Sequence, residues 1–155
     1  MTMPDKESVL AALLARAREE HAALAQVMRM AQDEATSDET KSEGKYDTRA
    51  TEASYLAAGQ GERVAQLARA IAWLDAARGA PDGPPLYVVE GPRGRAAFLL
   101  APEGGGQRAR VGALEVVVLT VRSPLGQALV GAREGDVVEV GEGAAVQEWG
   151  VVSVT

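Results

Sequence analysis

Carboxylates gather in one short stretch of this sequence, residues 33 to 47. The stretch sets six acids against two lysines, a charge of −4 within a chain whose net charge is −6. The acids are Asp33, Glu34, Asp38, Glu39, Glu43 and Asp47. Carboxylate oxygens can bind a hard cation such as Mg²⁺, so the position of these acids along the chain needs an explanation.

A solvated polar turn is the alternative interpretation, because charge clusters usually lie on solvated faces. A connection between two helices needs only about 2–8 residues. The polar stretch from Thr36 to Lys45 is longer than this, which favours a function for the acids.

The rest of the chain offers little else that could do chemistry. There is no cysteine and a single histidine, His21, and we find no serine–histidine–acid set and no cluster of metal ligands. The Gly104–Gly106 run is followed by Gln and Arg and opens no helix, which favours a hairpin loop over an anion-binding site. We therefore expect no enzymatic activity of the chain's own and no intrinsic cofactor.

Two helices must position the acidic stretch. Apolar and small residues recur in steps of four and three on both sides of it, which predicts two heptad seams facing each other in an antiparallel hairpin. The first helix is expected over residues 5 to 32, about 42 Å long at 1.5 Å per residue, with the acidic connection at the far end. The two seams are Leu10, Leu14, Ala17, His21, Leu24, Met28, Ala31 and Ala53, Ala57, Gln60, Val64, Leu67, Ile71, Leu74.

The second half predicts short strands instead. Residues 79–85 read Gly-Ala-Pro-Asp-Gly-Pro-Pro, which cannot continue a helix and predicts a linker between a hairpin over 1–78 and a second domain over 86–155. Strands are expected at 86–89, 97–100, 116–121, 137–140 and 150–154. A serine cap, a proline and a glycine stop predict one short helix within 123–131. The fold class is α+β.

The segment from Ser123 to Val140 resembles the C-terminal segment of the GreA and GreB transcript-cleavage factors, in the order Ser-Pro, Ala-Leu-Val-Gly and Gly-Asp-Val-Val-Glu-Val. The resemblance implies an FKBP-like C-terminal domain in a bacterial transcription elongation factor. It also implies that the Ser-Pro turn docks on the rim of the secondary channel of RNA polymerase. The residues carried over to docking are Ser123, Pro124, Leu125 and Gly126.

The hairpin end departs from the Gre pattern. Gre factors carry an Asp and a Glu three residues apart at the tip, whereas Asp38 and Glu43 are five apart, and the family's Leu and Asn are missing. The resemblance implies tip acids, here Asp38, Glu39 and Glu43, that act on Mg²⁺ supplied by the polymerase and stimulate cleavage of backtracked transcripts. Two acids are the minimum useful set, and Asp38 and Glu43 are the expected metal ligands, only in the complex. Because of the altered spacing, an alternative remains: the chain is an inhibitor of RNA polymerase that occludes the channel without stimulating cleavage.

Charge and composition limit the partners. A pI near 4.9 argues against direct sequence-specific binding to nucleic acid, no apolar run is long enough to span a membrane, and the lack of cysteine favours the cytoplasm. A monomer is expected because the seams are used within the hairpin, although Tyr55 and Trp73 leave an oligomeric scaffold open. A peptidyl-prolyl isomerase is the remaining alternative, disfavoured because the second half offers few aromatic residues.

Overall fold

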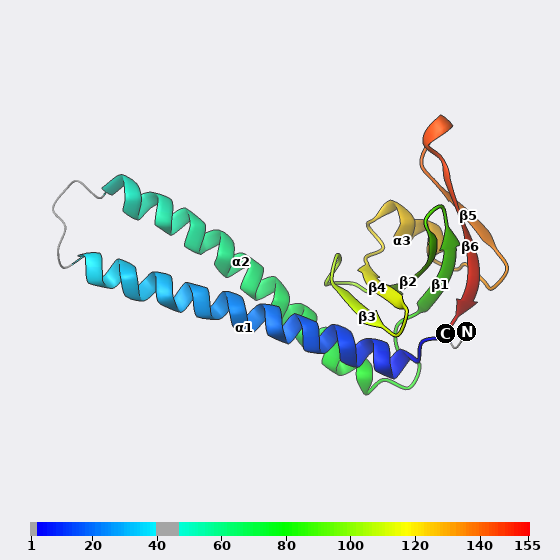
Figure 1. Ribbon diagram of the computed structural model, residues 1–155, viewed down its shortest axis with the longest axis horizontal. Coiled ribbons are helices and arrows are strands. Elements are labelled where there is room, and N and C mark those ends of the chain that lie inside the picture. Colours follow the sequence, from blue (N-terminus) through cyan, green and yellow to red (C-terminus); the bar gives the residue numbers. More distant parts are fainter. Residues whose placement is uncertain (1–2, 40–46) are drawn as a thin grey trace.

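The computed structural model describes the backbone of residues 3–39 and 47–155, and the side chains of 3–33 and 59–155. Two long helices come first, α1 (Lys6–Glu39) and α2 (Asp47–Arg78). A mixed sheet with one short helix and one 3-10 turn follows (Figure 1). Its elements are β1 (Leu86–Gly91), β2 (Gly94–Leu100), β3 (Arg108–Val111), β4 (Leu114–Leu119), α3 (Pro124–Leu129), β5 (Val137–Val140), η1 (Gly143–Ala145) and β6 (Gln147–Val154). The predicted α+β class is confirmed.

The two helices form an antiparallel hairpin that projects from the sheet (Figure 1). Their 34 and 32 residues correspond to about 51 and 48 Å at 1.5 Å per residue. The start of α1 and the end of α2 lie beside the sheet, and the end of α1 and the start of α2 lie at the opposite extreme of the molecule.

The predicted end of the first helix at residue 32 is wrong, because α1 continues to Glu39. The large apolar residues stop near Met30, but residues 31–39 contain no glycine or proline and include alanine and glutamate, which favour a helix. Only residues 40–46 then separate the two helices. That number lies within the ordinary range for helix–helix connections, so the length of the polar stretch no longer supports a function for its acids.

The sheet has six strands in the order β3-β4-β2-β1-β6-β5. All neighbours are antiparallel except β2 and β4, which are parallel. Strand β1 is central and buried on both faces: Leu86 and Val88 belong to the core shared with the hairpin, and Tyr87 and Val89 to a second core with Leu129 of α3. The sheet therefore lies between the base of the hairpin and α3.

The base of the hairpin buries two faces of α1. Leu10, Leu14 and Ala17 of the predicted seam are buried. Val9 and Leu13, which the seam does not include, are buried as well, in one cluster with Leu99 and Val116 of the sheet. Val9 and Leu13 lie outside the predicted seam because a heptad seam describes only the contacts between the two helices.

Strand β3 was not predicted, and β4 lies two residues earlier than the predicted 116–121. Strand β3 reads Arg-Ala-Arg-Val, so it has only two small or apolar residues and carries no β-branched run. Its residues pair antiparallel with β4, with Arg110 opposite Glu115. Tertiary pairing rather than local preference makes this segment a strand.

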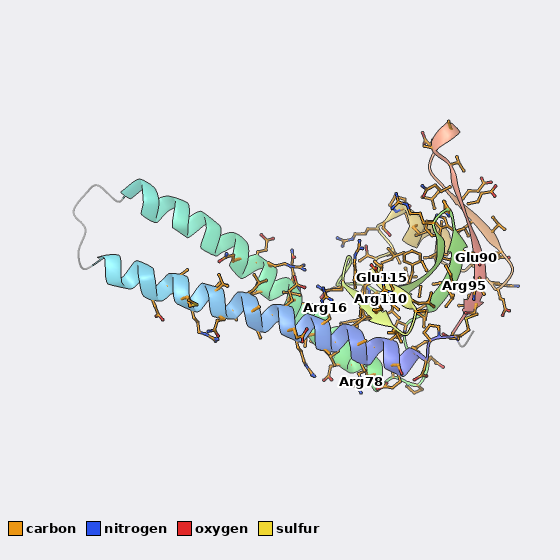
Figure 2. All side chains as sticks on the ribbon, viewed as in Figure 1. Arg16, Arg78, Glu90, Arg95, Arg110 and Glu115 are labelled. Atoms are coloured by element: carbon orange, nitrogen blue, oxygen red, sulfur yellow. The ribbon has the colours of Figure 1, made fainter. Side chains whose placement is uncertain are left out.

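Exposed ion pairs join elements at the base of the hairpin. A guanidinium nitrogen of Arg78, at the end of α2, lies 2.6 Å from Glu7 Oε1 near the start of α1, and Lys6 Nζ donates to the backbone carbonyl of Asp82 at 3.0 Å. Figure 2 shows Arg78 at this base, with Glu90 and Arg95 on the sheet. Each such exposed pair contributes at most about 1 kcal/mol, so the buried apolar cluster carries most of the stability here.

Candidate functional site

The predicted acids fall at the end of the hairpin far from the sheet. The backbone of Asp38 and Glu39 forms the last turn of α1, which lies at the far extreme of the molecule (Figure 1). Glu43 lies outside the described residues, as does the geometry of all three carboxylates. The structure thus separates the first two acids from the sheet by most of the length of α1.

The end of α1 is an electrostatically unusual place for acids. The C-terminus of a helix carries a partial negative charge from its unpaired carbonyl groups, and cations rather than anions are favoured there. The last turn of α1 contains Asp38 and Glu39 and no basic residue, whereas the last turn of α2 contains Arg78. The acids of α1 therefore do not stabilise their helix, and their negative charges add to the helix dipole to attract a cation.

Burial decreases along the hairpin away from the sheet. Leu14 is 1% exposed and the seam residues Leu24 and Met28 are half-buried, while Val27 is 48% and Met30 57% exposed. His21 is half-buried on the same seam, as expected for a packing residue. Among the described side chains, the outer part of α1 therefore buries little apolar surface.

The predicted docking turn is built by two of its four residues. Ser123 caps α3: its Oγ accepts a hydrogen bond from the Gly126 amide at 3.0 Å and donates to the Thr120 carbonyl at 2.8 Å. Gly126 is buried, and a Cβ there would lie 2.1 Å from the Thr120 oxygen. Both residue types are therefore explained by the shape of the turn itself.

The other two docking residues differ in what they present. Leu125 is half-buried against the cluster around Leu129, and Pro124 is exposed. Residues that the motif did not single out extend this surface, since Val121 and Val130 are 50% and 55% exposed. The sequence shows that valines flank the capped turn. Their exposure could not be read from the sequence, because it depends on how α3 lies on the sheet.

The acids and the docking turn are at different ends of the molecule (Figure 1). Helix α3 packs on the face of the sheet opposite the hairpin base. No group of three or more His, Cys, Asp or Glu residues able to hold a metal ion occurs among the described residues. Within the same part of the chain, no helix is long and apolar enough to cross a membrane.

Comparison with known proteins gives matches among solved structures. No family model matches the sequence, and no curated protein matches it. The structure of the transcription factor Gfh1 is similar to this chain at 19% identity and a TM-score of 0.36, over 92% of this chain and 93% of that one. The GreA factor homolog 1 protein of Thermus thermophilus is similar at 17% identity and a TM-score of 0.34, over 94% and 92% of the two chains. Gfh1 of Thermus aquaticus is similar at 17% identity and a TM-score of 0.33, over 93% and 94%.

The name Gfh1 stands for GreA factor homolog 1. At these identities and TM-scores the three structures do not assign an activity, so a function has to be argued from the residues of this chain.

Proposed function

We propose that this chain is a Gre-like factor that binds RNA polymerase through the secondary channel and uses the acids at the end of its hairpin on the active-site Mg²⁺ to stimulate cleavage of backtracked transcripts. The observation that carries the proposal is the projection of α1 and α2 from the sheet, with Asp38 and Glu39 in the last turn of α1. A hairpin about 50 Å long, at 1.5 Å per residue, can reach a buried catalytic centre while the sheet remains outside.

The role of the acids follows from the chemistry of Mg²⁺. A second, weakly held ion in a two-metal site stabilises the attacking and leaving oxygens of the displacement. Carboxylates of Asp38 and Glu43, with Glu39 beside them, would supply hard oxygen ligands to that ion. The polymerase provides the Mg²⁺ and the catalytic residues, and this chain provides the additional ligands.

Docking would use the turn around α3. Pro124 is exposed, and Ser123 and Gly126 hold the turn in shape. The sheet and α3 would then rest on the rim of the channel while the hairpin enters it.

The spacing of Asp38 and Glu43 supports a second candidate, a factor that occludes the channel and inhibits the polymerase. One assay separates the two functions: stalled, backtracked elongation complexes are incubated with Mg²⁺ and the protein, and the RNA is sized. Shortened RNA supports cleavage stimulation. Uncut RNA with slower nucleotide addition supports the inhibitor, and no effect on either reaction contradicts both.

A further inference from the structure

A cleft lies where the hairpin meets the sheet, far from the acidic end of the hairpin and next to the turn that precedes α3. Its volume is about 280 Å³, and one wall is α2 while the others are the loop after β2 and the turn before α3. It is lined by Arg63, Gln66, Leu67, Arg69, Ala70, Pro102, Glu103, Gly104, Gly105, Gln107 and Arg122. Small-molecule sites are typically about 300–1,000 Å³, so this cleft suits a small polar ligand.

The cleft is positively charged within an acidic protein. Three arginines line it, of which Arg63 pairs with Glu20 at 2.8 Å and Arg69 lies near Glu103, so the excess charge is +1 in a chain of net −6. Arg69 is 3.6 Å from Glu103, a loose and largely exposed pair. Arg122 has no ion-pair partner in the part of the chain that the structure describes. Because Arg122 has no acidic partner there and Arg69 has only a loose one, the cleft favours binding of an anion.

Gln107 offers a hydrogen-bonding side chain to the cleft. It is 5% exposed, and no other polar or charged residue is classed as buried among those described. Its side-chain amide has no hydrogen-bond partner in the described structure, and its oxygen and nitrogen are not sealed from the cleft that it lines. These two atoms remain accessible to solvent, because no side-chain nitrogen or oxygen that is sealed from solvent lacks a hydrogen-bond partner among the described residues. A ligand in the cleft can therefore accept a hydrogen bond from this amide in place of water.

The loop that carries Gln107 is fixed against the helix. A Cβ at Gly104 would lie 3.3 Å from Cβ of Ala70 on α2, and Gly104 and Gly106 have positive φ angles of 82° and 90°. The sequence alone favoured a plain hairpin loop here, because the glycine run opens no helix. The arginines that make the site basic come from α2 and from the segment before α3.

We propose that this cleft binds a small phosphate-bearing ligand. Arg122 and Arg69 would hold the phosphate oxygens, since guanidinium groups match phosphate geometry in a bidentate manner, and Gln107 would donate its amide from the floor. The ligand would contact both the hairpin and the sheet. The site does not depend on binding to RNA polymerase.

Isothermal titration calorimetry on the isolated protein tests the site, with inorganic phosphate, pyrophosphate and adenosine monophosphate as probes at constant ionic strength. We expect binding of a phosphate probe, weakened at least tenfold by Arg122→Gln and by Gln107→Leu, and less by Arg122→Lys. Arg93→Gln is the matched control, because Arg93 is an exposed arginine in the turn between β1 and β2, at the other end of β2. Comparing inorganic phosphate with adenosine monophosphate shows whether the phosphate group alone is recognised.

Circular dichroism of each variant establishes that it is folded, and Arg122→Gln changes only an exposed side chain. Two results would overturn the proposal. One is the absence of binding for all three probes. The other is an affinity of Arg122→Gln equal to that of Arg93→Gln.

Discussion

The two ends of the hairpin differ in burial and in charge. At the base, α1 buries Val9, Leu10, Leu13 and Leu14 in one apolar cluster with α2 and the sheet. At the far end, α1 finishes with two acids at the unfavourable pole of its own dipole, beyond the mostly exposed Met30. The comparison indicates that stability resides mainly in the base, and that the acids at the end of α1 do not add to it.

Shortening a buried side chain at the base of the hairpin gives the largest expected effect on stability. Leu13→Ala should lower the free energy of unfolding by about 2–5 kcal/mol, because it leaves a cavity in a fully buried site. Met30→Ala, on the outer half of the same helix and 57% exposed, should change it by less than about 0.5 kcal/mol. Urea denaturation of both variants measures the difference, and equal losses would show that stability is spread evenly along the hairpin.

Removal of the acids at the far end should lower activity without lowering stability. A combined Asp38→Ala, Glu39→Ala, Glu43→Ala variant should reduce transcript cleavage by about 100-fold or more, since metal ions stabilise transition states by several kcal/mol and each 1.4 kcal/mol is about tenfold. Its free energy of unfolding should be unchanged or slightly higher, because two unfavourable charges leave the end of α1.

RNA sizing and urea denaturation on the same preparation check both expectations. A parallel Glu19→Ala, Glu62→Ala variant is the control, because both acids are exposed on the hairpin but outside its end. Loss of cleavage in this control would show that overall charge, and not the position of the acids, matters.

The docking turn permits a finer separation of folding from binding. Ser123→Ala should cost about 1 kcal/mol of stability, because α3 loses its N-cap. Pro124→Ala should weaken binding to RNA polymerase with a smaller change in stability, because its ring is exposed. Thermal unfolding and a pull-down with polymerase measure the two effects, and equal binding by Pro124→Ala and the native chain would remove Pro124 from the interface.

The smallest effect is expected in the middle of α2. Gly59 lies inside the helix, and nothing is within 4 Å of the position its Cβ would take. Gly59→Ala should therefore raise the free energy of unfolding by up to about 1 kcal/mol through helix propensity alone. A decrease would mean that the hairpin needs a flexible point there.

Much of the fold was predictable because it follows from local patterns. The heptad steps located both helices, and the Ser-Pro segment located α3. Strand β3, the second buried face of α1 and the true end of α1 were missed. Arg108–Val111 becomes a strand only through pairing with β4, and Val9 and Leu13 are buried only because the sheet lies beside the hairpin.

The site was predictable in part for the same reason. A run of acids between two seams indicates the end of a hairpin, so Asp38 and Glu39 could be placed far from the sheet. The cleft of Arg63, Arg69, Gln107 and Arg122 combines residues from three separate segments, and no spacing along the chain reveals it.

The central claim is that the acidic end of the hairpin reaches the catalytic centre of RNA polymerase while the base stays outside. The chain has no cysteine, so Ser42→Cys places a single photo-crosslinker at this end without removing an acid, and Ala76→Cys places one on an exposed position at the base. In backtracked complexes, we predict that residue 42 crosslinks to the RNA 3′ end or to polymerase peptides that bind the catalytic Mg²⁺, and that residue 76 does not. Crosslinks from residue 42 confined to the outer surface of the polymerase would contradict the account.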